Sequence, residues 1–193
     1  MATYQAIGSV AEAVRRLLEQ SWENQAGGLH PVFEVYHRTD FDTPMTTGVS
    51  IFVYQVGIDP VQRTLPPSAA DRRRPLPICM SLLLTAWATN ASTEQLLLGW
   101  AMRAIDDNPV LSSGFLNAAV PGVFRPEETV ELVAAQLSND EVFQLWQAMP
   151  IELQLSMPYQ ARVIRIESDI TEPVGTPVQV RELRYADATG GAR

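Results

Sequence analysis

The clearest pattern in the chain is an uncharged, apolar run over residues 78–88, which directly follows Pro75 and Pro77. A short apolar run bounded by turn residues is typical of a buried strand, although a buried helix can have the same composition. In a strand, alternate side chains point to opposite faces, and both faces of this run are largely apolar. The first face carries Ile78, Met80, Leu82, Leu84 and Ala86, and the second carries Cys79, Ser81, Leu83, Thr85 and Trp87. We therefore expect a central strand covered on both sides, with Cys79 buried and unreactive.

Upstream of this run, one amphipathic helix and two strands are predicted. Over residues 3–22 the apolar side chains recur at helical spacing and form a one-sided stripe. The stripe consists of Ile7, Val10, Val14, Leu17 and Leu18. It would cover the protein's own sheet or, as the alternative, dock on a partner. Residues 32–37 alternate, and residues 49–58 are rich in β-branched and aromatic side chains, so both stretches favour strands.

Downstream of the run, Ser92 and Gln95 have the spacing of a capping box, which predicts a helix from Thr93 to about Asn108. Its inner face would carry Leu97, Trp100, Ala101, Ala104 and Ile105. Residues 109–126 are too apolar for a free linker, so we expect a packed, irregular segment with one helical turn near Phe115.

The last third of the chain is predicted to be mostly strand. Residues 129–137 favour a strand, although their alanines make a helix nearly as plausible, and Ser138 should cap a short helix. Residues 151–157 alternate cleanly, Pro158 interrupts them, and residues 159–166 resume as strand. Residues 171–180 could add an edge strand.

Together these elements predict an α/β (α+β) fold in one domain. A mixed or antiparallel sheet would be flanked by the N-terminal helix and the central helix over residues 1–168. Residues 169–193 form a C-terminal extension that we expect to be partly flexible, because it is rich in small residues near its end.

The composition limits the partners and the compartment. The net charge of −8, from 22 acidic and 14 basic residues, disfavours a general binder of nucleic acid or of an anionic membrane. No apolar run approaches about 18 residues, and the N-terminus lacks a signal-peptide pattern. We therefore expect no membrane span and a cytoplasmic protein. The single cysteine excludes an internal disulfide.

Two charged clusters are candidate protein contacts. The connection over residues 60–77 carries four arginines: Arg63, Arg72, Arg73 and Arg74. The last three are the only dense positive cluster in this acidic chain; a solvated loop is the plain interpretation, and contact with an acidic protein surface is the alternative. Asp106 and Asp107 end the predicted helix, where the helix dipole disfavours acids. They mark a second place where a positive partner could bind, and an ordinary solvated helix end is the alternative.

Catalytic and metal-binding motifs do not stand out. The sequence has no GxSxG, HExxH, phosphate-binding loop or GxGxxG pattern. His30 and His37 are separated by a proline and lack the spacing of a common metal motif. A triad assembled only in space would leave no local motif, but two histidines and one cysteine provide few acid–base groups. We expect no enzyme, no metal and no cofactor.

Four stretches, in this order, resemble the tail-cap, or tail-terminator, proteins of extracellular contractile injection systems, which are phage-tail-like particles. They are the opening helix with Tyr4-Gln-Ala-Ile7 and Leu17-Leu18; Gly48 to Val56 followed by Asp59-Pro60 and Arg63; the buried run leading into Glu94 to Gly99 and Asn108 to Leu111; and Phe143 to Trp146 followed by Tyr159 to Val163. Together they span most of residues 1–168.

The resemblance implies a tail-terminator-like α/β protein that forms a hexameric ring. Such a ring sits on the end of the inner tube and sheath and ends their assembly, and the family brings no catalytic residues or cofactor. Its implied partners are other copies of the chain and the tube and sheath proteins, with no nucleic acid or membrane. It would be cytoplasmic as part of an assembled particle, which could be released. A non-enzymatic adaptor or scaffold that docks tail or baseplate proteins is the alternative function, and a small hydrolase is the third.

Overall fold

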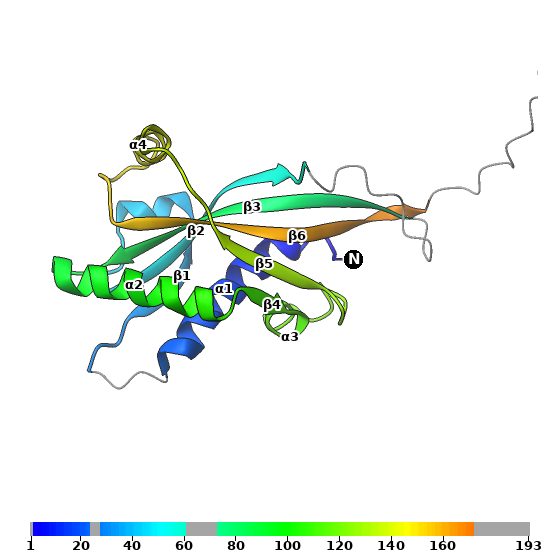
Figure 1. The fold of residues 1–193 in the computed structure, drawn as a ribbon, viewed down its shortest axis with the longest axis horizontal. Helices are drawn as coiled ribbons and strands as arrows, with labels where there is room; N and C mark the ends of the chain where they lie inside the picture. Colours follow the sequence, from blue (N-terminus) through cyan, green and yellow to red (C-terminus); the bar gives the residue numbers. More distant parts are fainter. Residues whose placement is uncertain (1, 24–27, 61–72, 172–193) are drawn as a thin grey trace, which may run out of the picture.

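A six-stranded mixed sheet organises the computed structural model, which describes residues 2–23, 28–60 and 73–171 (Figure 1). In chain order the elements are α1 (Ala6–Glu23), β1 (Val32–Tyr36), the 3-10 helix η1 (Arg38–Asp42), β2 (Gly48–Ile58), β3 (Arg73–Trp87), α2 (Ala91–Asp107), β4 (Val110–Ser112), α3 (Ser113–Leu116), β5 (Thr129–Ala134), α4 (Asn139–Gln147) and β6 (Ser156–Thr171). The strand order is β1-β2-β3-β6-β5-β4; β1 is parallel to β2, and the other neighbouring pairs are antiparallel. The predicted fold class is confirmed.

Strand β3 lies in the middle of the sheet, as the sequence predicts. It pairs with β2 on one side and with β6 on the other. All the side chains predicted for its first face are buried, namely Ile78, Met80, Leu82, Leu84 and Ala86. On its second face Leu83, Thr85 and Trp87 are also buried. The alternation of a strand that is covered on both sides therefore accounts for this run.

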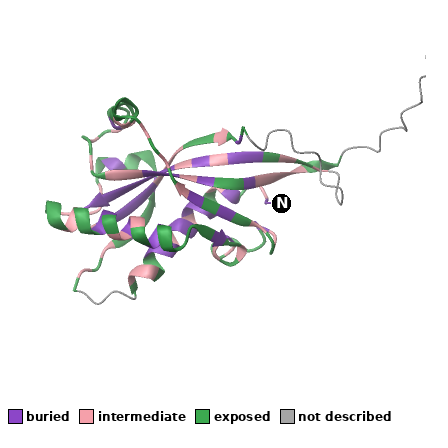
Figure 2. Ribbon diagram, in the orientation of Figure 1, coloured by how far each residue is buried: buried purple, intermediate pink, exposed green. Residues whose placement is uncertain are grey.

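Helices cover the two faces of the sheet unequally (Figures 1 and 2). One face packs against α1 and α2, and the stripe of α1 is buried there from Val10 to Leu18, so its own-sheet interpretation is confirmed. The other face carries a smaller aromatic core of Tyr36, Phe41, Leu83, Trp87 and Trp146, which η1 and α4 complete. The Trp87 indole N–H donates to the Ser50 hydroxyl at 2.9 Å, which satisfies the polar atom of this buried ring.

Cys79 is only half-buried, so the expectation that it is buried is wrong. It lies on the second face of β3, toward the start of the strand, and the residue opposite it on β2 is Gly57. Gly57 has no side chain to cover the thiol, and the aromatic core lies farther along the strand, at Leu83 and Trp87. The Cys79 Sγ donates a weak hydrogen bond to the Gly57 carbonyl oxygen at 3.7 Å.

Helix α2 begins earlier than predicted and has a different cap. Asn90, rather than Ser92, is the N-cap residue, and its side-chain oxygen accepts from the Thr93 backbone N–H at 2.9 Å. Asn is at least as good a cap as Ser, and the chain leaves β3 only three residues before it. Leu98 is buried while Trp100 is half-buried, so the inner face is rotated slightly from the predicted one.

Prolines lie inside strands, in contrast to the prediction that they separate them. Pro77 is in β3, and its carbonyl oxygen accepts from the N–H of Asp59, just beyond the end of β2. Pro158 is in β6, and its carbonyl oxygen accepts from the N–H of Ala135, just beyond the end of β5. In an antiparallel sheet the N–H and C=O of one residue face the same neighbour. The missing N–H of each proline therefore faces a place where the neighbouring strand has ended, which makes it tolerable.

The stretch 151–157 is largely not a strand, so the predicted alternation failed there. β6 begins only at Ser156, and residues 151–155 form the connection from α4. Leu153 and Leu155 are exposed instead of pointing inward. Within the segment expected to be irregular, the structure adds the short strand β4 and confirms a helical turn, α3, at Phe115.

Strand β6 continues past the predicted domain boundary at residue 168 and ends at Thr171. The proposed edge strand over 171–180 lies outside the described residues except for its first residue, and so does the C-terminal tail. The boundary itself stays a prediction.

A β-bulge strains β6 at Val163. Between the pairs Ile78↔Ile164 and Met80↔Ala161, β6 has one more residue than β3. Val163 absorbs this extra residue with a backbone φ of 68°. A left-handed conformation is rare for a β-branched residue, because its Cβ crowds the following carbonyl.

An ion-pair network lies on the outer side of α1. Glu12 accepts from Arg15 at 2.8 and 2.9 Å and from Arg16 at 3.1 Å, and Arg15 also donates to Glu19. The hydrogen bond from Arg15 lowers the pKa of Glu12, while partial burial acts in the opposite direction. The same hydrogen bond raises the pKa of Arg15.

The Val163→Gly variant should be more stable than the wild type, by about 1 kcal/mol, because glycine adopts positive φ without strain. Val35→Gly is the matched control, since Val35 is also a strand valine with 37% exposure but has no positive φ. It should lose about 1 kcal/mol. Urea unfolding of both variants measures this; a loss of stability in Val163→Gly as large as that in Val35→Gly contradicts the strain.

The Glu12→Gln variant should lose about 0.5–1 kcal/mol of stability at pH 7. Because the folded-state pKa of Glu12 is lowered, its ionised form stabilises the fold above its ordinary pKa, and this contribution disappears as the pH falls through the folded pKa. The difference between wild type and variant, measured by urea unfolding, should therefore shrink from pH 7 to pH 3. Glu127→Gln, at an exposed loop position, is the control and should show little difference at either pH.

Candidate functional site

The described residues do not contain a group of three or more His, Cys, Asp or Glu side chains that could hold a metal ion. His37 caps η1: its backbone N–H donates to the Asp40 carboxylate at 2.7 Å, and its ring accepts from the Thr39 N–H. His30 lies elsewhere, at the mouth of a cleft beside β1. The two histidines therefore have different surroundings and do not form a common site.

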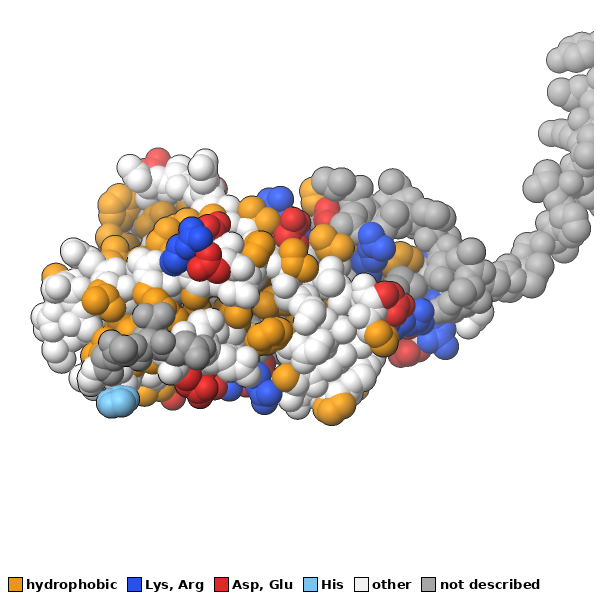
Figure 3. All heavy atoms as spheres, turned by 60° about the horizontal axis from the view of Figure 1, so that its bottom comes forward, with side chains coloured by type: hydrophobic (Ala, Val, Ile, Leu, Met, Phe, Trp, Pro, Cys, Tyr) orange, Lys and Arg blue, Asp and Glu red, His pale blue; other side chains and the backbone are white. Residues whose placement is uncertain are grey.

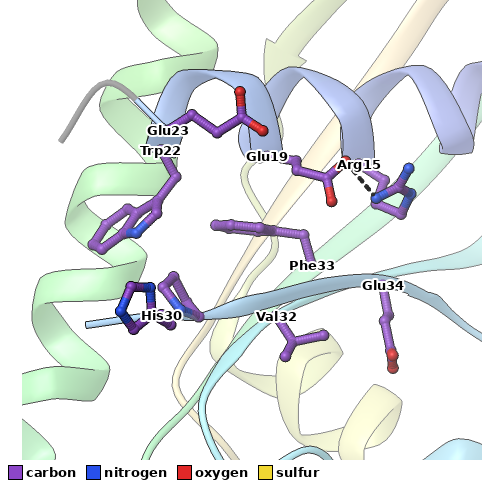
Figure 4. Close-up of a pocket in the computed structure, with 9 residues that line it drawn as sticks. Arg15, Glu19, Trp22, Glu23, His30, Val32, Phe33 and Glu34 are labelled. Carbon is purple, nitrogen blue, oxygen red and sulfur yellow. Dashed lines mark hydrogen bonds and ion pairs between the residues drawn. The ribbon is translucent and has the colours of Figure 1, made fainter. Parts of the chain in front are cut away.

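The cleft beside His30 has a volume of about 540 Å³ and lies between the end of α1 and β1 (Figure 4). Its inner wall is aromatic: the Trp22 ring centroid is 4.7 Å from that of Trp100 and 6.5 Å from that of Phe33. The Trp22 indole N–H donates to the Leu29 carbonyl oxygen at 3.2 Å. At the other end Glu19 is paired with Arg15 rather than pointing alone into the cleft. The ring contacts hold α1 against β1 and α2. The Trp22 indole N–H and the Glu19 carboxylate already have partners within the chain.

A second hollow, of about 620 Å³, separates α4 from the second face of the sheet. Tyr54, Ser81, Gln160 and Glu141 contribute to its walls. Burial raises the pKa of Tyr54, and a hydrogen bond with Ser81 opposes the rise. Hydrogen bonds from Ser138 lower the pKa of Glu141, which caps α4. Both shifts favour the ordinary charge states at neutral pH, so neither group is prepared for proton transfer.

The most distinctive feature is an arm whose tip, formed by the ends of β3 and β6, extends beyond all the helices (Figure 1). We define the arm as residues 53–58 of β2, 73–80 of β3 and 161–171 of β6. Strand β1 pairs only with Gly48 to Phe52 of β2, so within the described residues the outer edge of β2 has no strand partner in the arm. Near the tip, Ala2 covers part of the β6 edge: its N–H donates to Arg165 at 2.9 Å, and its carbonyl oxygen accepts from Glu167 at 2.7 Å. Open edges of this kind can pair with another chain.

The arm carries an apolar patch on the face that α1 covers farther along the sheet. Val56, Ile58 and Leu76 are 42–49% exposed. The register places Val56 opposite Met80 and Ile58 opposite Ile78, both buried, so the patch continues the core beyond its cover. We define the arm patch as Val56, Ile58, Leu76 and Arg74. Arg74 is exposed and lies on the same face of β3 as Leu76.

A second exposed apolar surface lies at α4. A groove of about 340 Å³ is lined by Phe143, Trp146, Met149 and Leu153, among others. Phe143 and Leu153 are about half exposed, at 53% and 50%. Acidic residues lie on the same stretch: Asp140 is in the first turn of α4, and Glu152 lines the groove. We call this surface the α4 groove.

Of the six residues predicted as interface candidates, four are described, and the structure does not bring them together. Arg73 and Arg74 begin β3 rather than belonging to a loop, which corrects the predicted connection. Arg73 pairs with Glu167 at 3.6 Å, and Arg125 also binds Glu167, at 3.1 Å. Arg63 and Arg72 lie outside the described residues. A role for these arginines in an interface stays a prediction.

Asp106 and Asp107 lie at the end of α2, far from the tip of the arm (Figure 1). Arg103, one turn earlier, pairs with Asp106 at 3.0 Å and also with Asp107. Their own helix therefore provides the positive charge that was expected from a partner. Figure 3 shows a cluster of basic and acidic side chains on the helical face, with apolar side chains around it. Whether a partner also binds there stays a prediction.

Sequence reasoning missed the α4 groove and the apolar part of the arm patch. It assigned Leu153 to the inside of a strand, and it had no means to place Ile58 and Leu76 beyond the cover of α1. One signal was available: residues 126–161 contain six acidic residues and no Lys or Arg. Among the described residues, no helix is long and apolar enough to cross a membrane.

The fold is shared with two solved cap structures. The sheath/tube terminator of PVC, an extracellular contractile injection system, in its extended state aligns with a TM-score of 0.60 and 18% identity over 96% of this chain. The tube-terminating cap of the anti-feeding prophage aligns with a TM-score of 0.56 and 15% identity over 91% of this chain. The chain spans 66% and 60% of the lengths of these two proteins.

No curated protein matches the chain. The sequence model of the Pvc16 N-terminal domain family matches residues 9–180, which is most of the chain. Together with the shared fold, this match confirms the resemblance to tail-cap proteins that the sequence indicated. The chain belongs to the family of Pvc16 N-terminal domains.

Proposed function

We propose that this protein is a structural cap of a contractile injection system, which binds the end of the inner tube and sheath and ends their assembly. The observation that carries the proposal is the fold shared with a sheath/tube terminator and with a tube-terminating cap along more than nine tenths of the chain. The family match over residues 9–180 supports it independently. In this role the protein is made in the cytoplasm and becomes part of the particle.

The cap acts as a hexameric ring. A ring requires two different surfaces on each subunit, because each copy must contact the next one head to tail. The structure offers such separate surfaces, since the arm patch and the α4 groove belong to different ends of the molecule (Figure 1). In this proposal residues 1–168 form the ring-building domain, and the C-terminal extension, residues 169–193, contacts neighbouring subunits.

The function needs no catalysis. Among the polar groups that line these two hollows, Glu19 pairs with Arg15 and Glu141 belongs to the cap of α4, and the pKa shifts of Tyr54 and Glu141 do not prepare a base or a nucleophile. These observations support a protein that acts through its shape and contacts, without a cofactor.

Deleting the protein from particle-producing cells should give tubes of irregular or excessive length, because nothing then stops their growth. Supplying the full chain should restore a uniform length. Leu82→Asp places a charge at a fully buried core position and should unfold the protein. This control should fail to restore a uniform length, which shows that the effect needs the folded chain. Electron microscopy of tube lengths makes the measurement. Particles of unchanged length but lower number would favour the adaptor function instead.

A further inference from the structure

We propose that the ring closes head to tail, with the arm patch of one subunit bound in the α4 groove of a second copy. This contact rests on the proposed ring, and the occupant of the groove is a second copy of this chain.

The arm patch is apolar with a basic end. Val56, Ile58 and Leu76 expose almost half of their surfaces, although they continue the core face of the sheet. Isolated exposed apolar residues are common, but a contiguous apolar group beside an open strand edge is characteristic of an interaction site. Arg74 extends the patch toward the tip on the same face as Leu76, and Arg73 precedes it in β3.

The α4 groove is apolar with an acidic rim. Phe143 and Leu153 are half exposed, and Trp146 closes the floor. Asp140 lies one turn before Phe143 on α4, and Glu152 precedes Leu153. Asp140 and Glu152 give the rim negative charge, and the 36 residues from 126 to 161 carry six acids and no Lys or Arg. An apolar, positively charged counterpart fits such a groove.

The arm patch matches both requirements. The apolar side chains of the arm patch would pack against the apolar groove, and the arginine at its end would face the carboxylates at the rim. The two surfaces lie at different ends of the molecule in Figure 1, so they do not meet within one subunit. Complementary surfaces at two separate places on one chain produce a heterologous contact, which forms a ring when the rotation between subunits closes.

Charge reversal tests the contact. Arg74→Glu reverses the charge of the arm patch, and the double variant Asp140→Arg with Glu152→Arg reverses the charge of the α4 groove. Each variant alone should form rings at least ten-fold less well than the wild type, because like charges then face each other. An equal mixture should recover them, since the reversed arm meets the reversed groove and the unaltered arm meets the unaltered groove, in an alternating ring with an even number of subunits.

The measurement is electron microscopy of the full chain, both free and on purified tube ends, with circular dichroism to confirm folding. Arg103→Glu, on the exposed side of α2, is the control and should leave rings intact. If the wild type forms rings and both reversed variants form them equally well, this contact is wrong while the ring stands. If the wild type forms no ring in either setting, the proposed function fails as well.

Cysteine cross-linking gives a second test that does not depend on charge. In a Cys79→Ser background, Leu76→Cys and Leu153→Cys in one chain should oxidise to a ladder of covalent multimers that ends at the complete ring. Each cysteine alone should give no cross-linked dimer. Dimers from Leu76→Cys alone would show an arm-to-arm contact, and cross-links only to another tail protein would assign the groove to that protein; either result overturns the proposal.

Discussion

The ladder between β3 and β6 is the interaction on which the rest of the structure depends. It runs from the pair Thr85↔Ser156 to the pair Arg73↔Thr171, and β2 and β5 attach to its two sides. Because β3 is paired along both edges and packed on both faces over its second half, that half carries no charged side chain. The helices α1 and α2 gain their stability by covering this one surface.

The arm follows from a difference in length between the two kinds of element. At about 3.3 Å per residue the 15 residues of β3 span roughly 50 Å. At 1.5 Å per residue the 18 residues of α1 span only about 27 Å, so no helix of this size can cover the sheet from end to end. The uncovered end keeps apolar side chains and an open strand edge in solvent. A monomer gains nothing from that arrangement, whereas an assembly can use both features.

Charge is distributed in the same uneven way. Along α1 and at the end of α2, acids and arginines pair on neighbouring turns of their own helix. Near the tip of the arm, Glu167 joins Arg73 and Arg125. Residues 126–161, which include α4, carry six acids and no Lys or Arg, and Arg162 lies across the hollow beside α4. Exposed pairs contribute little to stability, so their main effect is to cancel charge locally and to leave the α4 region as an acidic surface.

The sequence by itself determined the elements whose signals are local. Helical spacing predicted α1, an uncharged apolar run after prolines predicted β3, and Ser138 as a cap predicted the start of α4. Only the tertiary structure decided where neighbouring strands end. The ends of the neighbouring strands placed Pro77 and Pro158 inside strands, left Cys79 only half-buried opposite a glycine, and exposed Ile58 and Leu153. The physical reason is that burial and free hydrogen-bond edges depend on partners that are distant in the chain, whereas spacing and capping depend on residues within one or two turns.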